Sequence, residues 1–134
     1  MGLPGAGKTH LAKRLQVHLN CAWYNADKVR EMANDWDFTD PGRRRQSARM
    51  NTLATFEGSR GRTVICDFVC PTGETREQFT ADLTIWMDTI QQGRFDDTNK
   101  IFENPTDFDY QIEGYMSDPE IIEFANTLKE KHDV

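Results

Sequence analysis

The chain has 134 residues, of which 37% are hydrophobic and 28% are charged, and its formal net charge is −6. This length suits one domain with its own core, so we expect a single domain over residues 1–134. The acidic balance disfavours general nucleic-acid binding, which needs a basic face, and no apolar run reaches membrane-spanning length. No signal peptide precedes the first motif, which makes the cytoplasm the default expectation.

The first motif of the chain is a glycine-rich segment, Gly2-Leu3-Pro4-Gly5-Ala6-Gly7-Lys8-Thr9, which matches the phosphate-binding pattern G-x-x-x-x-G-K-[ST]. In such a loop the backbone N–H groups surround the phosphates, the lysine reaches the β- and γ-phosphates, and the hydroxyl binds Mg²⁺. We therefore expect an ATP site with Lys8 as a catalytic residue and Thr9 as a metal ligand. The expected nucleotide-binding residues are Gly2, Pro4, Gly5, Ala6, Gly7, Lys8, Thr9 and His10. The alternative is an ordinary glycine-rich turn before a helix.

A phosphate loop normally follows a buried strand, yet only Met1 precedes Gly2 in this chain. Either that strand is missing here or the sheet is completed in another way, and the sequence leaves both open. After the loop, Leu11, Leu15 and Leu19 recur every four residues, which predicts a helix over residues 9–20. The side chains of His10 and His18 are expected at the surface of this helix rather than as metal ligands.

A short buried strand is predicted over residues 21–24, and Asp27 follows it closely. Ligands of open α/β sheets gather at the carboxyl ends of strands, so Asp27 is a candidate for chemistry. A helix over residues 28–34 and a loop over 35–42 come next. The run Arg43-Arg44-Arg45 with Arg49 then opposes the acidic average of the chain. It is interpreted as an anion site, with a solvated helix start as the alternative.

Residues 63–69 form the strongest strand pattern of the chain, with Asp67 near its end. Asp67 is a candidate magnesium residue or, equally, the cap of a neighbouring loop. We further predict a helix over residues 74–81, a strand over 83–88, an edge strand over 107–112 and a helix over 119–131 with Asp118 as N-cap. The three cysteines form no C-x-x-C pair and are expected as reduced, mostly buried thiols.

This alternation of strands and helices predicts an α/β protein with the three-layer P-loop kinase fold, a mostly parallel sheet and a missing or truncated first strand. From Gly2 to about residue 88, the order of motifs resembles adenylyl-sulfate (APS) kinases, which use ATP to phosphorylate the 3′-hydroxyl of adenosine 5′-phosphosulfate. The D-G-D-N-x-R motif of that family falls on Asn25-Ala26-Asp27-Lys28-Val29-Arg30. The resemblance implies that Asp27 receives the proton of the attacking hydroxyl.

The same resemblance implies further substrate-binding residues. The family's G-F-S-x-x-D-R stretch, which runs into N-I-R-R, falls on Phe38, Arg43 and Arg49. Its F-I-S-P-Y motif falls on Phe68-Val69-Cys70-Pro71. The substrate-binding set is then Asp27, Arg30, Phe38, Arg43, Arg49 and Phe68.

Several positions depart from the family pattern. Asn25 replaces the first Asp of D-G-D-N, and N-I-R-R reads Gln46-Ser47-Ala48-Arg49. The basic lid R-D-P-K-G-L-Y has no counterpart after the strand expected at 83–88, where only Arg94 stands. The resemblance therefore implies a short, lid-poor relative of the family.

We accordingly expect an ATP- and Mg²⁺-dependent phosphotransferase, with APS as the first candidate for the acceptor. Another small molecule or a nucleic-acid end is the alternative within this class. A nucleotide-binding module without catalysis and a structural remnant are the alternatives outside it. The expected partner is a small nucleotide, with no membrane, and a homodimer stays open.

Overall fold

The computed structural model describes residues 1–93 and 96–134. Its elements follow in the order α1 Lys8–Leu19, β1 Ala22–Asn25, α2 Ala26–Ala33, α3 Asp40–Ser59, β2 Val64–Asp67, α4 Gly73–Gln78, β3 Ile85–Met87, α5 Asp96–Ile101, β4 Tyr110–Ile112 and α6 Asp118–His132. None of the helices within the described residues is long and apolar enough to cross a membrane. The position of Arg94 lies outside the described residues.

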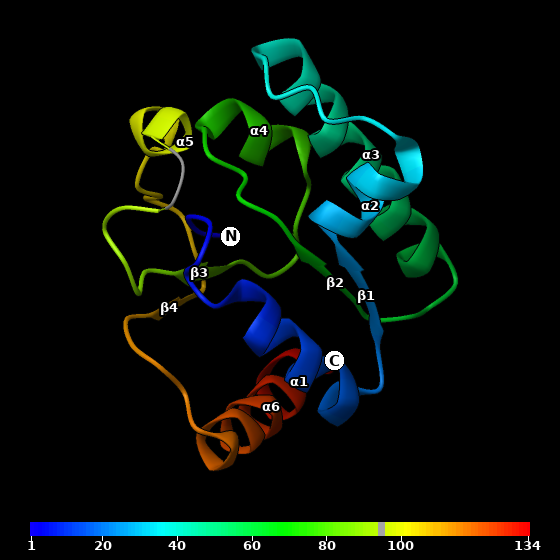
Figure 1. The fold of residues 1–134 in the computed structure, drawn as a ribbon. Coiled ribbons are helices and arrows are strands. Elements are labelled where there is room, and N and C mark those ends of the chain that lie inside the picture. Colours follow the sequence, from blue (N-terminus) through cyan, green and yellow to red (C-terminus); the bar gives the residue numbers. More distant parts are fainter. Residues whose placement is uncertain (94–95) are drawn as a thin grey trace.

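The strands form two parallel pairs, β1 with β2 and β3 with β4. Between the pairs runs the start of the chain (Figure 1). Met1 bonds to β3 as a strand residue would, because its amino group donates to the Ile85 carbonyl and its carbonyl accepts from the Met87 N–H, both at 2.8 Å. The predicted parallel α/β architecture is confirmed. Met1, which precedes the phosphate loop, pairs with β3.

Helices cover both sides of the strands (Figure 1). On one side, α1 and α6 pack together through a buried cluster of Ala6, Leu11, Leu15, Met87, Ile121, Ala125 and Leu128. On the other side, α2 and α3 meet the sheet through Val29, Met50, Phe68 and Cys70. The leucines predicted to form the buried stripe of the first helix do so at positions 11 and 15. Two apolar layers therefore hold the strands between helices.

The predicted elements are found with small shifts at their ends, and two details of the prediction are wrong. The N-cap of α6 is Ser117 rather than Asp118, since the Ser117 hydroxyl accepts from the Glu120 N–H and the Glu120 carboxylate accepts from the Ser117 N–H. Residues 40–42 belong to α3 rather than to a loop, because Thr39 caps that helix and Pro41 fits its first turn. Both helices begin after a hydroxyl side chain that caps the helix and lies one residue before an aspartate.

The three cysteines are free, as expected from their spacing. Cys21 and Cys70 are buried and Cys66 is partly buried. Burial raises the pKa of the Cys66 thiol to about 12, and that of Cys70 is raised for the same reason. These thiols are consequently protonated and unreactive near neutral pH.

We predict that Ile121→Ala destabilises the protein by about 2–5 kcal/mol, the usual cost of emptying a buried aliphatic site. Ile121 is 0% exposed in the cluster that joins α1 to α6. The neighbouring Ile122→Ala is the matched control, because Ile122 is 43% exposed on the same helix. Chemical denaturation of both variants measures the difference, and equal stabilities would contradict this view of the core.

Candidate active site

The phosphate loop forms a tight curve that ends at the first residue of α1. Gly5 and Gly7 have φ angles of +90° and +92°, a region that side chains with a Cβ rarely enter. Gly7 is the N-cap of α1 and supplies no side-chain cap, so the N–H groups at this helix start stay directed at the loop's concave side. The geometry fits a phosphate group held by backbone donors and the positive end of the helix.

Lys8 lies across this loop. Its Nζ donates to the carbonyls of Gly2 and Leu3 at 2.9 and 3.0 Å, which keeps the ammonium group on the loop rather than in solvent. The far side of the loop is tied down by Thr89, whose hydroxyl donates to the Ala6 carbonyl at 2.7 Å. The loop is thus positioned by contacts from β3 and the segment after it, with Pro4 packed near Gly93.

A hydrogen-bonded network joins α1 to the ends of β1 and β2. The register of the parallel pair places Asn25 opposite Asp67. The Asn25 amide donates to Asp67 at 2.9 Å and to Thr9 Oγ1 at 3.2 Å, and Thr9 Oγ1 donates to Asp67 at 3.1 Å. Trp23 Nε1 also donates to the Asp67 carboxylate, at 3.4 Å. Three side chains from α1 and β1 therefore hold one buried carboxylate beside the phosphate loop.

This network fits a magnesium site in its chemistry. Mg²⁺ prefers hydroxyl and carboxylate oxygens together with water and substrate phosphates, and Thr9 and Asp67 supply the two protein oxygens 3.1 Å apart. The alternative for Asp67 was to cap a loop. Within the described residues its hydrogen bonds come from side chains of α1 and β1, so the capping interpretation has no support from its contacts.

Asp27 lies in the first turn of α2, two residues beyond the end of β1. It is exposed and makes no hydrogen bond or ion pair with the other described residues. The N-cap of α2 is Asn25, whose side chain accepts from the Lys28 N–H at 3.1 Å. The carboxylate of Asp27 is therefore not needed to start the helix.

His10 follows Thr9 in α1 and is partly buried rather than fully at the surface. Its ring lies 5.3 Å from the ring of Tyr115, and its Nε2 atom is buried without a hydrogen-bond partner in the described part of the chain. Tyr115 itself is 79% exposed. No local sequence pattern indicates this contact, because the two residues are distant along the chain.

The predicted arginine cluster is largely paired with acidic residues of its own chain. Arg45 forms two hydrogen bonds to the Asp35 carboxylate at 2.7 and 2.9 Å, and Arg49 donates to the same carboxylate at 2.8 Å. These bonds from Arg45 and Arg49 hold the pKa of Asp35 well below its usual range. Arg44 lies 3.5 Å from Glu74 of α4. An anion site made from all four guanidinium groups does not match these contacts.

The remaining substrate-binding candidates lie around Phe38. Arg30 is buried, donates to the carbonyls of Asp35 and Asp37, and stacks on the Phe38 ring at 4.3 Å. Burial lowers the pKa of the Arg30 guanidinium. The Arg43 guanidinium lies 5.5 Å from the centroid of the same ring, and Arg43 Nε donates to the Phe38 carbonyl. Phe38 is half exposed between them, whereas Phe68 is buried against Phe79.

One cavity adjoins the start of α3 and another adjoins the phosphate loop. The larger has a volume of about 400 Å³ and is lined by Asp40, Arg43, Arg44, Pro71, Thr72, Glu74, Thr75, Ile101 and Glu103. We call it the α3–α4 groove. Its volume falls within the roughly 300–1,000 Å³ of small-molecule sites. Its walls come from α3, from the segment that follows β2, and from the residues around the end of α5.

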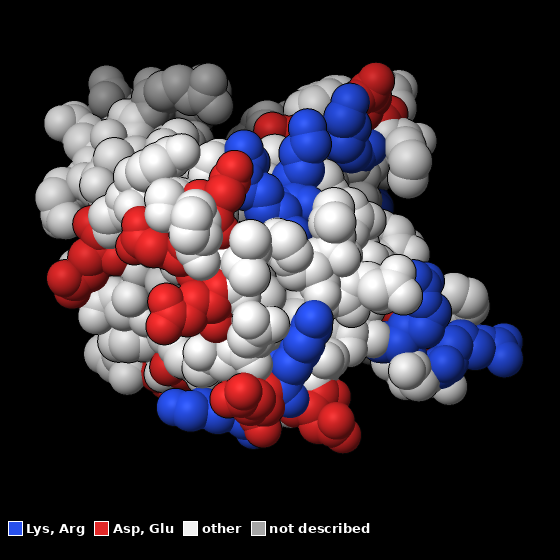
Figure 2. Space-filling model, turned by 90° about the horizontal axis from the view of Figure 1, so that it is seen from below, with Lys and Arg blue, Asp and Glu red and all other residues white. Residues whose placement is uncertain are grey.

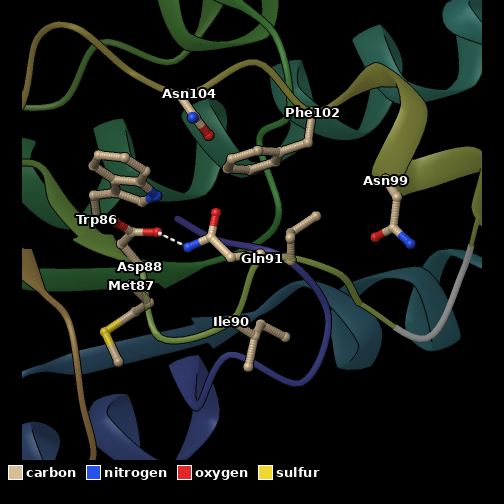
Figure 3. Close-up of a pocket in the computed structure, with 9 residues that line it drawn as sticks. Trp86, Met87, Asp88, Ile90, Gln91, Asn99, Phe102 and Asn104 are labelled. Atoms are coloured by element: carbon tan, nitrogen blue, oxygen red, sulfur yellow. Dashed lines mark hydrogen bonds between the residues drawn. The ribbon is translucent and has the colours of Figure 1, made fainter.

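The smaller cavity, of about 50 Å³, lies between Leu3 of the phosphate loop, the end of β3 and the α5 region. Figure 3 shows its polar side chains, with Gln91 directed toward Asp88 at 3.5 Å and Asn104 on the opposite side. This volume is far below the range of ligand pockets, so the α3–α4 groove is the candidate for a second substrate.

The surface charge is uneven as well. Figure 2 shows the face seen from below Figure 1, where acidic side chains gather mostly on the left and basic ones mostly on the right, with an uncharged stretch between them. The net charge of −6 is therefore an average over regions of opposite sign.

Comparison with known proteins assigns the chain to a family. Residues 1–91 match the adenylylsulphate kinase family model. No curated protein sequence matches significantly. The solved structures that resemble the chain include the Mycobacterium tuberculosis APS kinase CysC in complex with AMPPNP and APS. It has a TM-score of 0.79 and 19% identity, over 100% of this chain and 95% of that one. A sugar kinase from Janibacter sp. HTCC2649 gives a TM-score of 0.73 at 16% identity, over 98% and 92%.

These structural likenesses show the fold, and the family match covers the phosphate loop, the network at the strand ends and the arginine-bearing start of α3. The prediction of a kinase with a nucleotide-binding phosphate loop is thereby confirmed. The individual roles predicted for the site residues stay predictions. The chain belongs to the adenylylsulphate kinase family and is an ATP-dependent kinase.

Proposed function

We propose that this kinase transfers the γ-phosphoryl group of ATP to the 3′-hydroxyl of adenosine 5′-phosphosulfate, with Mg²⁺ as the metal. The observation that carries the proposal is the α3–α4 groove. It is lined by Arg43 and by the residues after β2, and β2 also places Asp67 beside the phosphate loop. A donor site and an acceptor site are then joined by one short segment, residues 67–72. In open α/β sheets the two substrates meet at this edge of the strands.

On the donor side, Lys8 and the N–H groups of the phosphate loop bind the phosphates and balance their charge. Thr9 and Asp67 would hold Mg²⁺, which neutralises charge that develops on the transferred group. Such electrostatic stabilisation and positioning supply most of the catalysis in phosphoryl transfer.

On the acceptor side, Asp27 accepts the proton of the attacking hydroxyl, and the set Arg30, Phe38, Arg43, Arg49 and Phe68 builds the acceptor site. Arg43 is the arginine of this set that lines the groove. A related enzyme of the same fold was solved with AMPPNP and APS together, which supports a site for both nucleotides in this architecture.

A second acceptor class is favoured by the charge of the groove. Its lining carries the carboxylates of Asp40, Glu74 and Glu103 beside the guanidinium groups of Arg43 and Arg44. Such mixed lining also suits a hydroxyl-rich or zwitterionic small molecule, and one solved structure of this fold is described as a sugar kinase.

We further propose that residues 1–134 form one kinase domain. The buried hydrophobic cluster that joins Ala6 of the phosphate loop to Leu128 of the last helix supports a single domain. A location in the cytoplasm belongs to the same proposal, and a homodimer is an open alternative to a monomer.

Product analysis decides the acceptor. The protein is incubated with MgATP and either APS, adenosine 5′-phosphate or an uncharged sugar, and the phosphorylated product is identified by mass spectrometry. The proposal expects the 3′-phosphate of APS. If an uncharged alcohol is phosphorylated while APS is not, the APS assignment fails and the ATP site alone survives.

For the donor site we predict that Lys8→Ala weakens ATP binding by about tenfold or more, because a charged hydrogen bond to phosphate is lost. Lys13→Ala on the exposed side of the same helix is the control and should bind ATP like the original protein. Calorimetric titration with MgATP measures both, and melting curves check that each variant is folded. Equal affinities for the two variants would refute the role of Lys8.

For the acceptor site we predict that Asp27→Asn lowers kcat by about 10²–10⁴-fold, the range for loss of a positioned base, while ATP affinity changes little. The melting temperature should stay the same, since Asn25 rather than Asp27 caps α2. Glu31→Gln, an exposed carboxylate on the same helix, is the control. An unchanged kcat in Asp27→Asn would show that Asp27 takes no part in the mechanism.

A further inference from the structure

The segment Asp35-Trp36-Asp37-Phe38 between α2 and α3 is held by side chains from both helices. Arg30 of α2 donates to two of its carbonyls, those of Asp35 at 2.8 Å and Asp37 at 3.2 Å. Arg45 and Arg49 of α3 bind the Asp35 carboxylate. A segment without secondary structure is thus fixed by three guanidinium groups.

The Asp35 carboxylate is the centre of these contacts. It accepts three hydrogen bonds from the two arginines of α3 and is only 12% exposed. Its Oδ1 atom also accepts from the Asp37 N–H at 3.3 Å, which turns the segment back toward α3. Charge-assisted, partly buried bonds of this kind are stronger than exposed ion pairs.

The segment leads directly to the α3–α4 groove. The Phe38 carbonyl accepts from Arg43 Nε at 2.9 Å, and Arg43 lines the groove. The Phe38 ring lies over Arg30 at 4.3 Å, so both the ring and the carbonyl are set by the path of residues 35–38. A change in that path moves Arg43 and Phe38 together.

We propose that Asp35 is a positioning residue of the acceptor site, which draws Arg45 and Arg49 onto the segment 35–38 and thereby places Phe38 and Arg43 at the α3–α4 groove. Asp35 acts as an internal anion, and Arg45 and Arg49 contribute through it. The inference rests on the proposed acceptor site, but the contacts of Asp35 do not depend on which acceptor binds there.

The test compares Asp35→Ala with Glu57→Ala. Glu57 is a matched control, because it is another little-exposed carboxylate paired with an arginine, Arg62 at 2.7 Å, at the opposite end of α3. For Asp35→Ala we expect the KM for APS to rise by about tenfold or more, the size of effect of one lost charged hydrogen bond, and the KM for ATP to stay within about twofold. Glu57→Ala should leave the ratio of the two KM values unchanged.

Chemical rescue separates an anion role from a general loss of packing. Acetate, the free equivalent of the missing side chain, should lower the KM for APS in Asp35→Ala when compared with chloride at equal ionic strength. It should have no such effect on Glu57→Ala. If Asp35→Ala does not fold, Arg45→Ala serves instead, since Arg45 is half exposed and should raise the same KM by a smaller factor.

A third measurement is independent of the acceptor. Trp36 lies within the segment and is half exposed, so its quenching by acrylamide reports how firmly the segment is held. The signal is obtained as the difference between each protein and its Trp36→Phe counterpart. We expect stronger quenching in Asp35→Ala and partial reversal by acetate.

The outcomes separate the two proposals. If the original protein does not phosphorylate APS, the proposed function fails, and the quenching measurement still decides the role of Asp35. Unchanged Trp36 quenching in Asp35→Ala overturns the positioning role. The positioning role is also overturned if the KM for APS and the KM for ATP rise equally in both Asp35→Ala and Glu57→Ala. That result would mean that Asp35 only stabilises the fold.

Discussion

The parallel pairing of β1 with β2 is the constraint on which the site depends. It sets Asn25 opposite Asp67, and the amide of one then reaches the carboxylate of the other at 2.9 Å. Thr9 completes the contact from α1 because the phosphate loop ends one residue before it. A shift of the pairing by one residue would turn both side chains to opposite faces of the sheet, since side chains alternate along a strand. The oxygens of Thr9 and Asp67 that we propose as Mg²⁺ ligands would then be separated.

The strand β2 also connects the phosphate loop to the α3–α4 groove, the proposed acceptor site. Asp67 ends β2, and Pro71 and Thr72 reach the wall of the α3–α4 groove a few residues later. Cys70 has a φ of +48°, which turns the backbone sharply between the two. The Arg76 side chain holds this turn by donating to the Cys70 carbonyl at 2.9 Å. One strained connection therefore joins Asp67, beside the phosphate loop, to the wall of the α3–α4 groove.

The phosphate loop and the amphipathic helix after it could be predicted because both are local patterns, which depend on glycine conformations and on the spacing of Leu11 and Leu15. The link between Asn25 and Asp67 could not, since it needs the register of strands separated by about forty residues. Asn25 stood out only as a departure from the family motif. Its position just before a helix is the signal that could have identified it as the cap of α2. The hydroxyl caps Thr39 and Ser117 are local signals of the same kind, but residues 35–42 were expected as a loop and Asp118 as the cap of α6.

The run of arginines shows why charge alone does not define an anion site. Arg45 and Arg49 are four residues apart and share one face of α3, and that face meets Asp35. The side chain of Arg44 is rotated by about 100° around the helix axis from that of Arg45. It lies near Glu74 at the groove rather than near Asp35. Helical periodicity therefore divides one basic run between an internal contact and the lining of the α3–α4 groove. The number of guanidinium groups free to hold an acceptor depends on the acidic residues opposite each face, which only the fold brings into place.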